Sequence, residues 1–246
     1  MKTLLLSLLL AWTCYAPTPL FFGQNGASAA AFSPADVSGL KLWLVAGDVS
    51  GADGDTVQTW SARTPTTINA TQSTLASRPT LQLSEIKGQS AILSDGVNDF
   101  MTLSASIVTT GSWTVITVQK RLSSGGLGGS LGNNVAVVPP FAALEYGSLS
   151  RMYIASRTDQ KYSTIPSHAY HVITSQDNAG TLVMRVDGVN QSLTAAAATG
   201  SSNFERMFSR LGEFWGTYIA EILAWERALN STELGQIETY LLGKYF

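Results

Sequence analysis

The sequence predicts an all-β fold, a sandwich of antiparallel strands that carries one short C-terminal helix. Residues 112–119 (SWTVITVQ) are rich in the β-branched and aromatic side chains that favour strands. The letters DNAG at residues 177–180 form a hairpin-turn signal between two apolar segments. A single segment, residues 232–245, stands out for apolar positions at helical spacing.

Further strands are expected at residues 151–155, 171–174, 182–186 and 218–225. The last of these (YIAEILAW) is mostly apolar, so we expect it at the centre of a sheet. Two segments of small residues are expected to be loops, although four alanines in the second also suit a helical turn. These loops are at residues 123–130 and 195–202.

The predicted helix has a well-marked start. The Asn230 side chain can accept hydrogen bonds from the first turn, and Glu233 can return one to the backbone of Asn230. Leu234, Ile237 and Leu241 then form one apolar stripe. Many short strands with Gly-marked turns, and so little helix, favour a jelly roll.

The N-terminal residues differ in composition from the rest of the chain. We expect residues 1–30 to be a signal peptide or apolar N-terminal segment, and residues 31–246 to be one β-sandwich domain. Pro17 and Pro19 interrupt the apolar stretch before it reaches the about 20 residues that a membrane span needs. The expected protein is therefore secreted and has no stable transmembrane span. The alternatives are a retained anchor and an apolar arm buried in an assembly.

Composition narrows the classes of partner. Charged residues make up 13% of the chain, and the formal net charge is −2. Nucleic-acid binding requires a clustered basic surface, so no nucleic-acid partner is expected. The two histidines and one cysteine exclude a dense zinc site built from those residue types.

Three short motifs follow one another in the order expected of an extracellular sandwich. They are LKLWLVA at residues 40–46, SDGVNDF at residues 94–100 and EILAWERALN at residues 221–230. Together they resemble the concanavalin A-like superfamily, and within it the laminin-G-type jelly-roll domains of secreted bacterial and phage proteins. The resemblance spans nearly all of residues 33–246 and implies a concanavalin A-like jelly-roll β-sandwich.

The chain departs from this family at positions that bear on calcium. Val45 replaces an acidic residue of the family pattern, and calcium takes six to eight oxygen ligands, usually including carboxylates. Asp48, Asp53 and Asp55 remain as a candidate Ca²⁺ site. The alternative is that these carboxylates belong to a solvated turn.

No catalytic carboxylate pair is evident. Some relatives hydrolyse glycans with closely spaced carboxylates, and retaining hydrolysis needs two carboxyl groups about 5–5.5 Å apart. The nearest pair here, Glu221 and Glu226, would point to opposite faces of a regular strand. We therefore do not expect an enzyme, and glycoside hydrolysis is the third of the functions considered.

The expected function is non-catalytic binding of a glycan or other cell-surface ligand, as in adhesion. Trp215 and Tyr218 are the candidate ligand-binding residues, because they lie in a Gly-bracketed aromatic segment, GEFWGTY at residues 212–218. Trp43, Trp60, Trp113 and Trp225 are expected in the core, and core packing is also the alternative for Trp215. The alternative function is structural, as a decoration or fibre protein of a virion or surface assembly, with other copies of the chain as partners.

Overall fold

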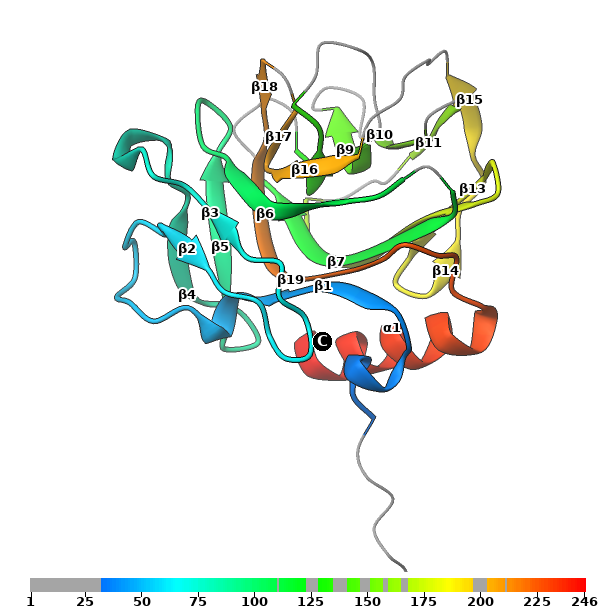
Figure 1. The fold of residues 1–246 in the computed structure, drawn as a ribbon, viewed down its shortest axis with the longest axis horizontal. Coiled ribbons are helices and arrows are strands. Elements are labelled where there is room, and N and C mark those ends of the chain that lie inside the picture. The colour runs from blue at the N-terminus through cyan, green and yellow to red at the C-terminus, as the bar shows by residue number, and fades with distance from the viewer. Residues whose placement is uncertain are drawn as a thin grey trace, which may run out of the picture. The chain divides into compact units, whose positions relative to one another are not determined.

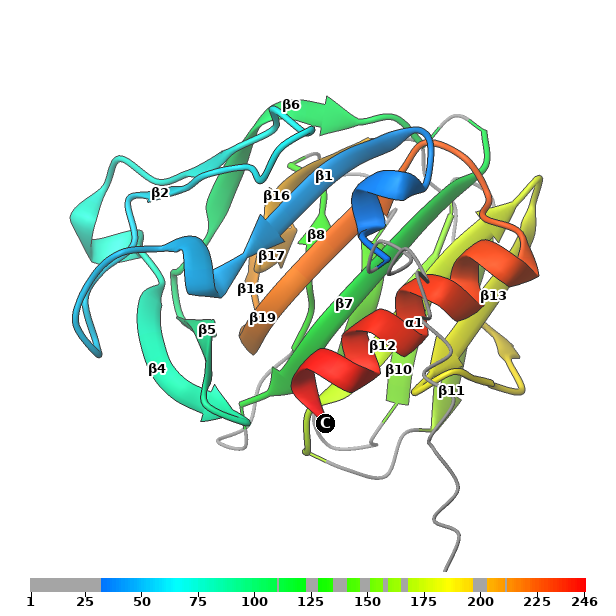
Figure 2. The same ribbon diagram turned by 90° about the horizontal axis from the view of Figure 1, so that it is seen from below.

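Two antiparallel sheets are layered in the described part of the chain, and a helix covers the outer face of the first (Figure 1, Figure 2). The structure is a computed structural model. It describes residues 32–109, 111–122, 128–134, 141–146, 151–156, 159–164, 168–196, 203–210 and 212–246, with the backbone alone for 141–146. The predicted signal segment, and residues 123–127 and 197–202 of the two predicted loops, lie outside these ranges.

The first sheet is built around its longest strand. Its order is β14 (Val189–Asn190), β13 (Thr181–Val186), β12 (His171–Asn178), β7 (Trp113–Arg121), β19 (Gly216–Trp225), β5 (Gln89–Asp95) and β4 (Thr80–Ile86), and β1 (Leu40–Val45) also pairs with β19. β7 lies along one side of β19, whereas β5 and β1 share the other side. The central position predicted for the late strand is confirmed.

The second sheet faces the first and carries the shorter strands. Its order is β15 (Thr194–Ala196), β11 (Gln160–Thr164), β10 (Arg151–Ala155), β9 (Phe141–Tyr146), β8 (Leu131–Gly132), β16 (Phe204–Met207), β6 (Met101–Ile107), β3 (Ala70–Thr71) and β2 (Thr59–Trp60). A separate hairpin joins β17 (Ser209–Arg210) to β18 (Glu213–Phe214). The second predicted loop is wrong at its start, because Ala195 and Ala196 pair with β11.

Alternation along the strands divides the apolar side chains between two cores. Leu42 and Leu44 of β1 face the second sheet, whereas Trp43 and Val45 face the helix. The first sheet is therefore buried on both faces, which explains the nearly continuous apolar sequences of β7 and β19. The four tryptophans predicted in the core are at most 4% exposed, which confirms that prediction.

The helix α1 (Ser231–Tyr245) begins at the predicted cap. The Asn230 side chain accepts hydrogen bonds from the backbone of Thr232 and Glu233, both at 3.0 Å, and Glu233 returns one at 2.9 Å. Leu234 and Ile237 belong to the core beneath the helix, as their spacing predicted. Three short 3₁₀ turns complete the described elements, at Pro34–Asp36, Ala46–Asp48 and Leu75–Ser77. Among the described residues, no helix has the length and apolar character that crossing a bilayer requires.

A β-bulge in β19 brings a carboxylate into the helix-side core. The register shifts between Ile219 and Glu221, so that Ala220 and Glu221 both face α1. Glu221 is 0% exposed. Its carboxylate accepts hydrogen bonds from Trp43 Nε1 at 2.7 Å, Lys244 Nζ at 2.6 Å and the hydroxyl group of Tyr245 at 2.8 Å. Glu221 thus ties the end of α1 to the first sheet, away from solvent.

Candidate ligand-binding groove

A polar row crosses four neighbouring strands on the outer face of the second sheet. Arg206 of β16 lies directly opposite Thr102 of β6. Thr102 lies opposite Thr71 of β3, which in turn lies opposite Thr59 of β2. Directly opposed residues project to the same face, with Cβ atoms about 4.5–5.5 Å apart. These four side chains therefore form one row, which we call the Arg–Thr row.

A groove of about 490 Å³ lies over the Arg–Thr row. The other residues that line it are Gln58, Gln72, Ser73, Thr74 and Phe100. Of the lining residues that the structure describes, five carry a hydroxyl group, two carry an amide, and none carries a carboxylate. The three threonines of the row are exposed, and their hydroxyl groups form no hydrogen bond with another described residue. The groove thus offers free donors and acceptors to a polar ligand.

Phe100 supplies the aromatic surface of the groove. Its backbone N–H donates to the carbonyl oxygen of Ser77 at 3.2 Å, and its own carbonyl oxygen accepts from Gln72 Nε2 at 3.1 Å. The half-buried ring lies 4.4 Å from Arg206 Cζ, and its centroid is 6.2 Å from that of Phe214. These contacts hold the ring in place at the end of the row.

The turn before Phe100 is held by its own carboxylates. Asp95 accepts a hydrogen bond from the backbone N–H of Val97 at 2.8 Å, and Asp99 accepts one from that of Asp95 at 3.0 Å. Both carboxylates thus act as turn-formers. Gly96 has a φ of +77°, and a Cβ there would lie 2.9 Å from the backbone nitrogen of Gly216. The turn therefore requires glycine at this position.

Burial makes Asp99 sensitive to pH. It raises the pKa of the Asp99 carboxyl from 3.8 to about 6, although the hydrogen bond from Asp95 lowers it. The Asp99 carboxyl therefore binds a proton more tightly in the native state than in the unfolded state. The contribution of this proton to the stability of the native state is complete below about pH 4 and is lost as the pH rises through about 6. Between about pH 4 and 7, we expect the free energy of unfolding of the wild type to fall by roughly 1–3 kcal/mol more than that of Asp99→Asn.

Urea denaturation of both proteins across this pH range measures that difference. The asparagine keeps an oxygen that can accept the hydrogen bond from Asp95, so the turn is preserved in the variant. A decline of the same size in both proteins would contradict the assignment to Asp99.

Arg206 is the charged residue of the groove. Its guanidinium forms no hydrogen bond or ion pair with another described residue. Burial lowers the pKa of Arg206, and the charge of the adjacent Glu205 opposes that change. A guanidinium that stacks on an aromatic ring keeps the N–H donors at its edge available.

Trp215, a predicted ligand-binding residue, lies just beyond the row but is covered. It is 0% exposed, so the exposed position predicted for it is wrong. Gly132 of β8 lies opposite Arg206, and a Cβ at Gly132 would be 2.6 Å from Trp215 Cη2 and 2.5 Å from the carbonyl oxygen of Ser209. The indole therefore fills the space over Gly132, next to the β17–β18 hairpin. The core-packing alternative describes Trp215 better.

Tyr218 lies in a different place, packed against the helix-side core. The Lys120 ammonium lies 4.1 Å from its ring centroid and 4.7 Å from that of Tyr170, and it pairs with Glu85 at 3.1 Å. Tyr218 lines a hollow of about 180 Å³ beside His168. The structure does not bring Trp215 and Tyr218 into one site.

The candidate calcium ligands are also separated by their contacts. Asp48 forms an ion pair with Arg63. Asp53 and Asp55 each accept a hydrogen bond from a backbone N–H, at 2.8 and 2.7 Å. Among the described residues, no group of three or more His, Cys, Asp or Glu side chains could hold a metal ion. The structure thus does not assemble Asp48, Asp53 and Asp55 into the site that calcium requires, and the turn alternative accounts for them.

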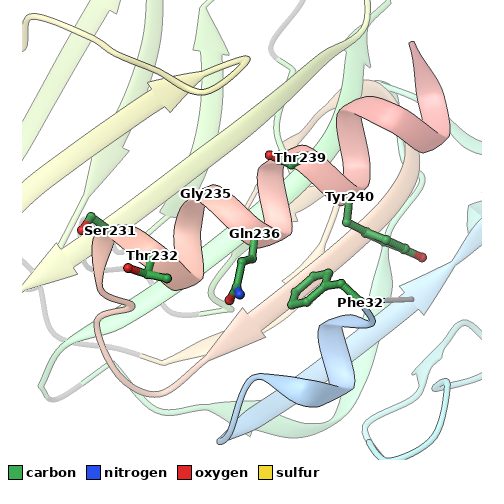
Figure 3. A pocket seen from close by; sticks show the side chains of 7 residues that line it. All are labelled: Phe32, Ser231, Thr232, Gly235, Gln236, Thr239 and Tyr240. Atoms are coloured by element: carbon green, nitrogen blue, oxygen red, sulfur yellow. The ribbon is translucent and has the colours of Figure 1, made fainter. Parts of the chain in front are cut away.

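A second, mainly apolar hollow of about 610 Å³ lies beside α1 (Figure 3). Its lining residues are Phe32, Ser231, Thr232, Gly235, Gln236, Thr239 and Tyr240. The rings of Phe32 and Tyr240 meet edge to face with centroids 6.2 Å apart. The described residues that line this hollow carry no charge and offer less hydrogen bonding than those of the groove.

Sequence reasoning did not single out Phe100 or Arg206. Phe100 ends a motif that was recognised, and its place directly after an Asp-Gly turn was the available signal. Arg206 carries no local signal, because its place beside Thr102 depends on pairing between strands far apart in the chain.

Comparison with known proteins identifies the architecture. No protein-family model and no curated protein matches the chain. The structure is similar to Trypanosoma rangeli sialidase, with a TM-score of 0.55 and 12% identity over 82% of this chain and 33% of the sialidase. It is also similar to the binding domain of Paraclostridial Mosquitocidal Protein 1, with a TM-score of 0.51 and 12% identity over 85% of this chain and 53% of that domain.

The fold is a concanavalin A-like jelly roll. This confirms the fold class expected from the sequence, whereas the narrower laminin-G-type assignment stays a prediction. The chain spans about a third of the sialidase and about half of the binding domain. At these identities the likeness establishes the fold alone.

Proposed function

We propose that this protein is a non-catalytic, extracellular carbohydrate-binding domain, and that the groove over the Arg–Thr row is its binding site. The observation that carries the proposal is the row of exposed, unbonded hydroxyl groups beside an aromatic ring. Hydroxyl groups both donate and accept, as the hydroxyl groups of a sugar do. The apolar C–H face of a sugar can pack on the Phe100 ring.

The extent of the row suits a short saccharide. Neighbouring strands lie about 4.8 Å apart, so four strands give a row of roughly 14 Å. The row is built on paired strands, which keep the hydroxyl groups in a constant arrangement. A pre-arranged site loses less conformational entropy when a ligand binds.

The composition of the groove supports binding without catalysis. The described residues of its lining include no carboxylate, thiol or imidazole to act as nucleophile or general base. Glu221, one of the two glutamates considered for hydrolysis, is buried beneath α1 and engaged by three donors. A solved structure named as a binding domain shares the fold, which makes a binding role a reasonable first test.

The test is binding to a glycan array, followed by calorimetry on the strongest ligand. We expect Phe100→Ala to weaken binding about five- to a hundredfold, because a stacked ring contributes about 1–3 kcal/mol. Tyr218→Ala is the matched control, since it removes a half-buried ring that does not line the groove. Weakening by Tyr218→Ala alone would place the site elsewhere, and reducing ends released on incubation with the bound glycan would overturn the non-catalytic assignment.

The structural role is the second candidate, and the apolar hollow beside α1 favours it. Phe32 and Tyr240 present aromatic surface there that a second copy of the chain could cover. Sedimentation velocity separates the two candidates. A defined oligomer that dissociates in Tyr240→Ala, together with no glycan binding, would favour assembly.

A further inference from the structure

Among the described residues that line the groove, Arg206 is the one charged side chain. The other lining residues are neutral, so the groove has a single positive charge at one end of its row of hydroxyl groups. A neutral sugar would leave this charge without a partner of opposite sign.

The setting of the guanidinium favours an anionic ligand. It is half-buried and stacked on Phe100, and no described residue forms an ion pair with it. Burial lowers its pKa, which indicates a cation that has lost part of its water without gaining a counter-ion. A ligand carboxylate would restore the missing charge-assisted hydrogen bonds.

From this geometry we infer that the ligand is a carboxylate-bearing saccharide, a uronate or a sialate, whose carboxylate binds Arg206 while its hydroxyl groups bind the threonines of the row. The inference rests on the proposed function and names its ligand class. Two parallel N–H donors of a guanidinium match the planar carboxylate.

The surroundings favour a singly charged carboxylate over a phosphate monoester, which carries about −1.5 to −2 charges near pH 7. Phosphate groups are commonly held by clusters of basic residues, whereas the described lining of the groove provides a single basic residue, Arg206. Glu205 directly precedes Arg206 in the sequence, and its negative charge would repel a more highly charged anion. One positive charge on Arg206, with the negative charge of Glu205 beside it, is matched better by a ligand group with a single negative charge.

The experiment compares three forms of one oligosaccharide by calorimetry: the uronate or sialate, its carboxyl-reduced neutral counterpart, and a sulfated counterpart of that neutral form. We expect the wild type to bind the carboxylated form about tenfold or more tightly than the reduced form, and at least as tightly as the sulfated form. We expect Arg206→Gln to bind the carboxylated and reduced forms equally. Rising salt should remove part of the wild-type preference.

Lys41→Gln is the matched control, because it removes the same unit charge from a half-exposed position on β1 of the first sheet. It should keep the wild-type preference, and equal thermal unfolding of all three proteins confirms that they are folded. Equal binding of the carboxylated and reduced forms by the wild type would overturn this inference and leave the proposed function standing. Preference for the sulfated form, or an unchanged preference in Arg206→Gln, would also overturn it. Binding of none of the saccharides, by a folded wild type, would overturn both.

Discussion

Replacing Trp215 with alanine is expected to lower the free energy of unfolding by about 3–5 kcal/mol. The indole is fully buried, and it fills the space between Gly132 and the β17–β18 hairpin. Its removal would leave a cavity in a region that the rigid pairing of β8 and β16 cannot close. No described group accepts a hydrogen bond from Trp215 Nε1, so the loss comes from packing.

Urea denaturation followed by far-ultraviolet circular dichroism measures this loss. Trp215→Phe is the control, and its smaller cavity should cost roughly half as much as that of Trp215→Ala. A loss below about 1 kcal/mol in Trp215→Ala, together with weaker glycan binding, would contradict the core role and restore the predicted ligand contact.

Replacing Glu221 with alanine is expected to cost a similar amount, about 3–5 kcal/mol, for an electrostatic reason. The change would leave the Lys244 ammonium, the Trp43 indole N–H and the Tyr245 hydroxyl group without their shared acceptor. Removing one partner of a buried ion pair leaves the other charge uncompensated. The C-terminal turn of α1 should then lose much of its attachment to β19.

Glu226 provides the matched control at the end of the same strand. It pairs with Lys41 at 3.3 Å, but the two side chains are 27% and 49% exposed. Loss of this ion pair in Glu226→Ala should therefore lower the free energy of unfolding by less than about 1 kcal/mol. The variant also loses the hydrogen bond that Glu226 accepts from the Val108 backbone N–H, which is counted separately. Chemical denaturation of both variants provides the comparison. Equal losses would show that the burial of Glu221 adds nothing to its contribution.

Elements with local determinants were predictable from the sequence. The strand at residues 151–155 and the helix after Asn230 agree with the structure to within one residue. The strand-favouring side chains of Tyr153 and Ile154 and the capping box act over a few neighbouring positions. The turn that Asp95 and Asp99 form also has local determinants. Each accepts a hydrogen bond from a backbone group within four residues.

The candidate site could be predicted only in fragments. Phe100 ends a motif that the sequence displays, yet nothing local indicates that Thr71 and Arg206 line the same groove. A bulge also altered the outcome for Glu221, since one extra residue in β19 set its side chain beneath α1. Register and bulges depend on pairing partners elsewhere in the chain.

The sequence by itself determined that this protein is an all-β sandwich with a capped terminal helix, because periodicity, turn chemistry and capping are written in neighbouring residues. Only the tertiary structure decided which polar side chains line the groove. Trp215 lies in a Gly-bracketed aromatic segment that suggests exposure, but Gly132 of a distant strand leaves the space that buries it. Arg206 gained its place in the groove in the same way, from the strands that pair beside it.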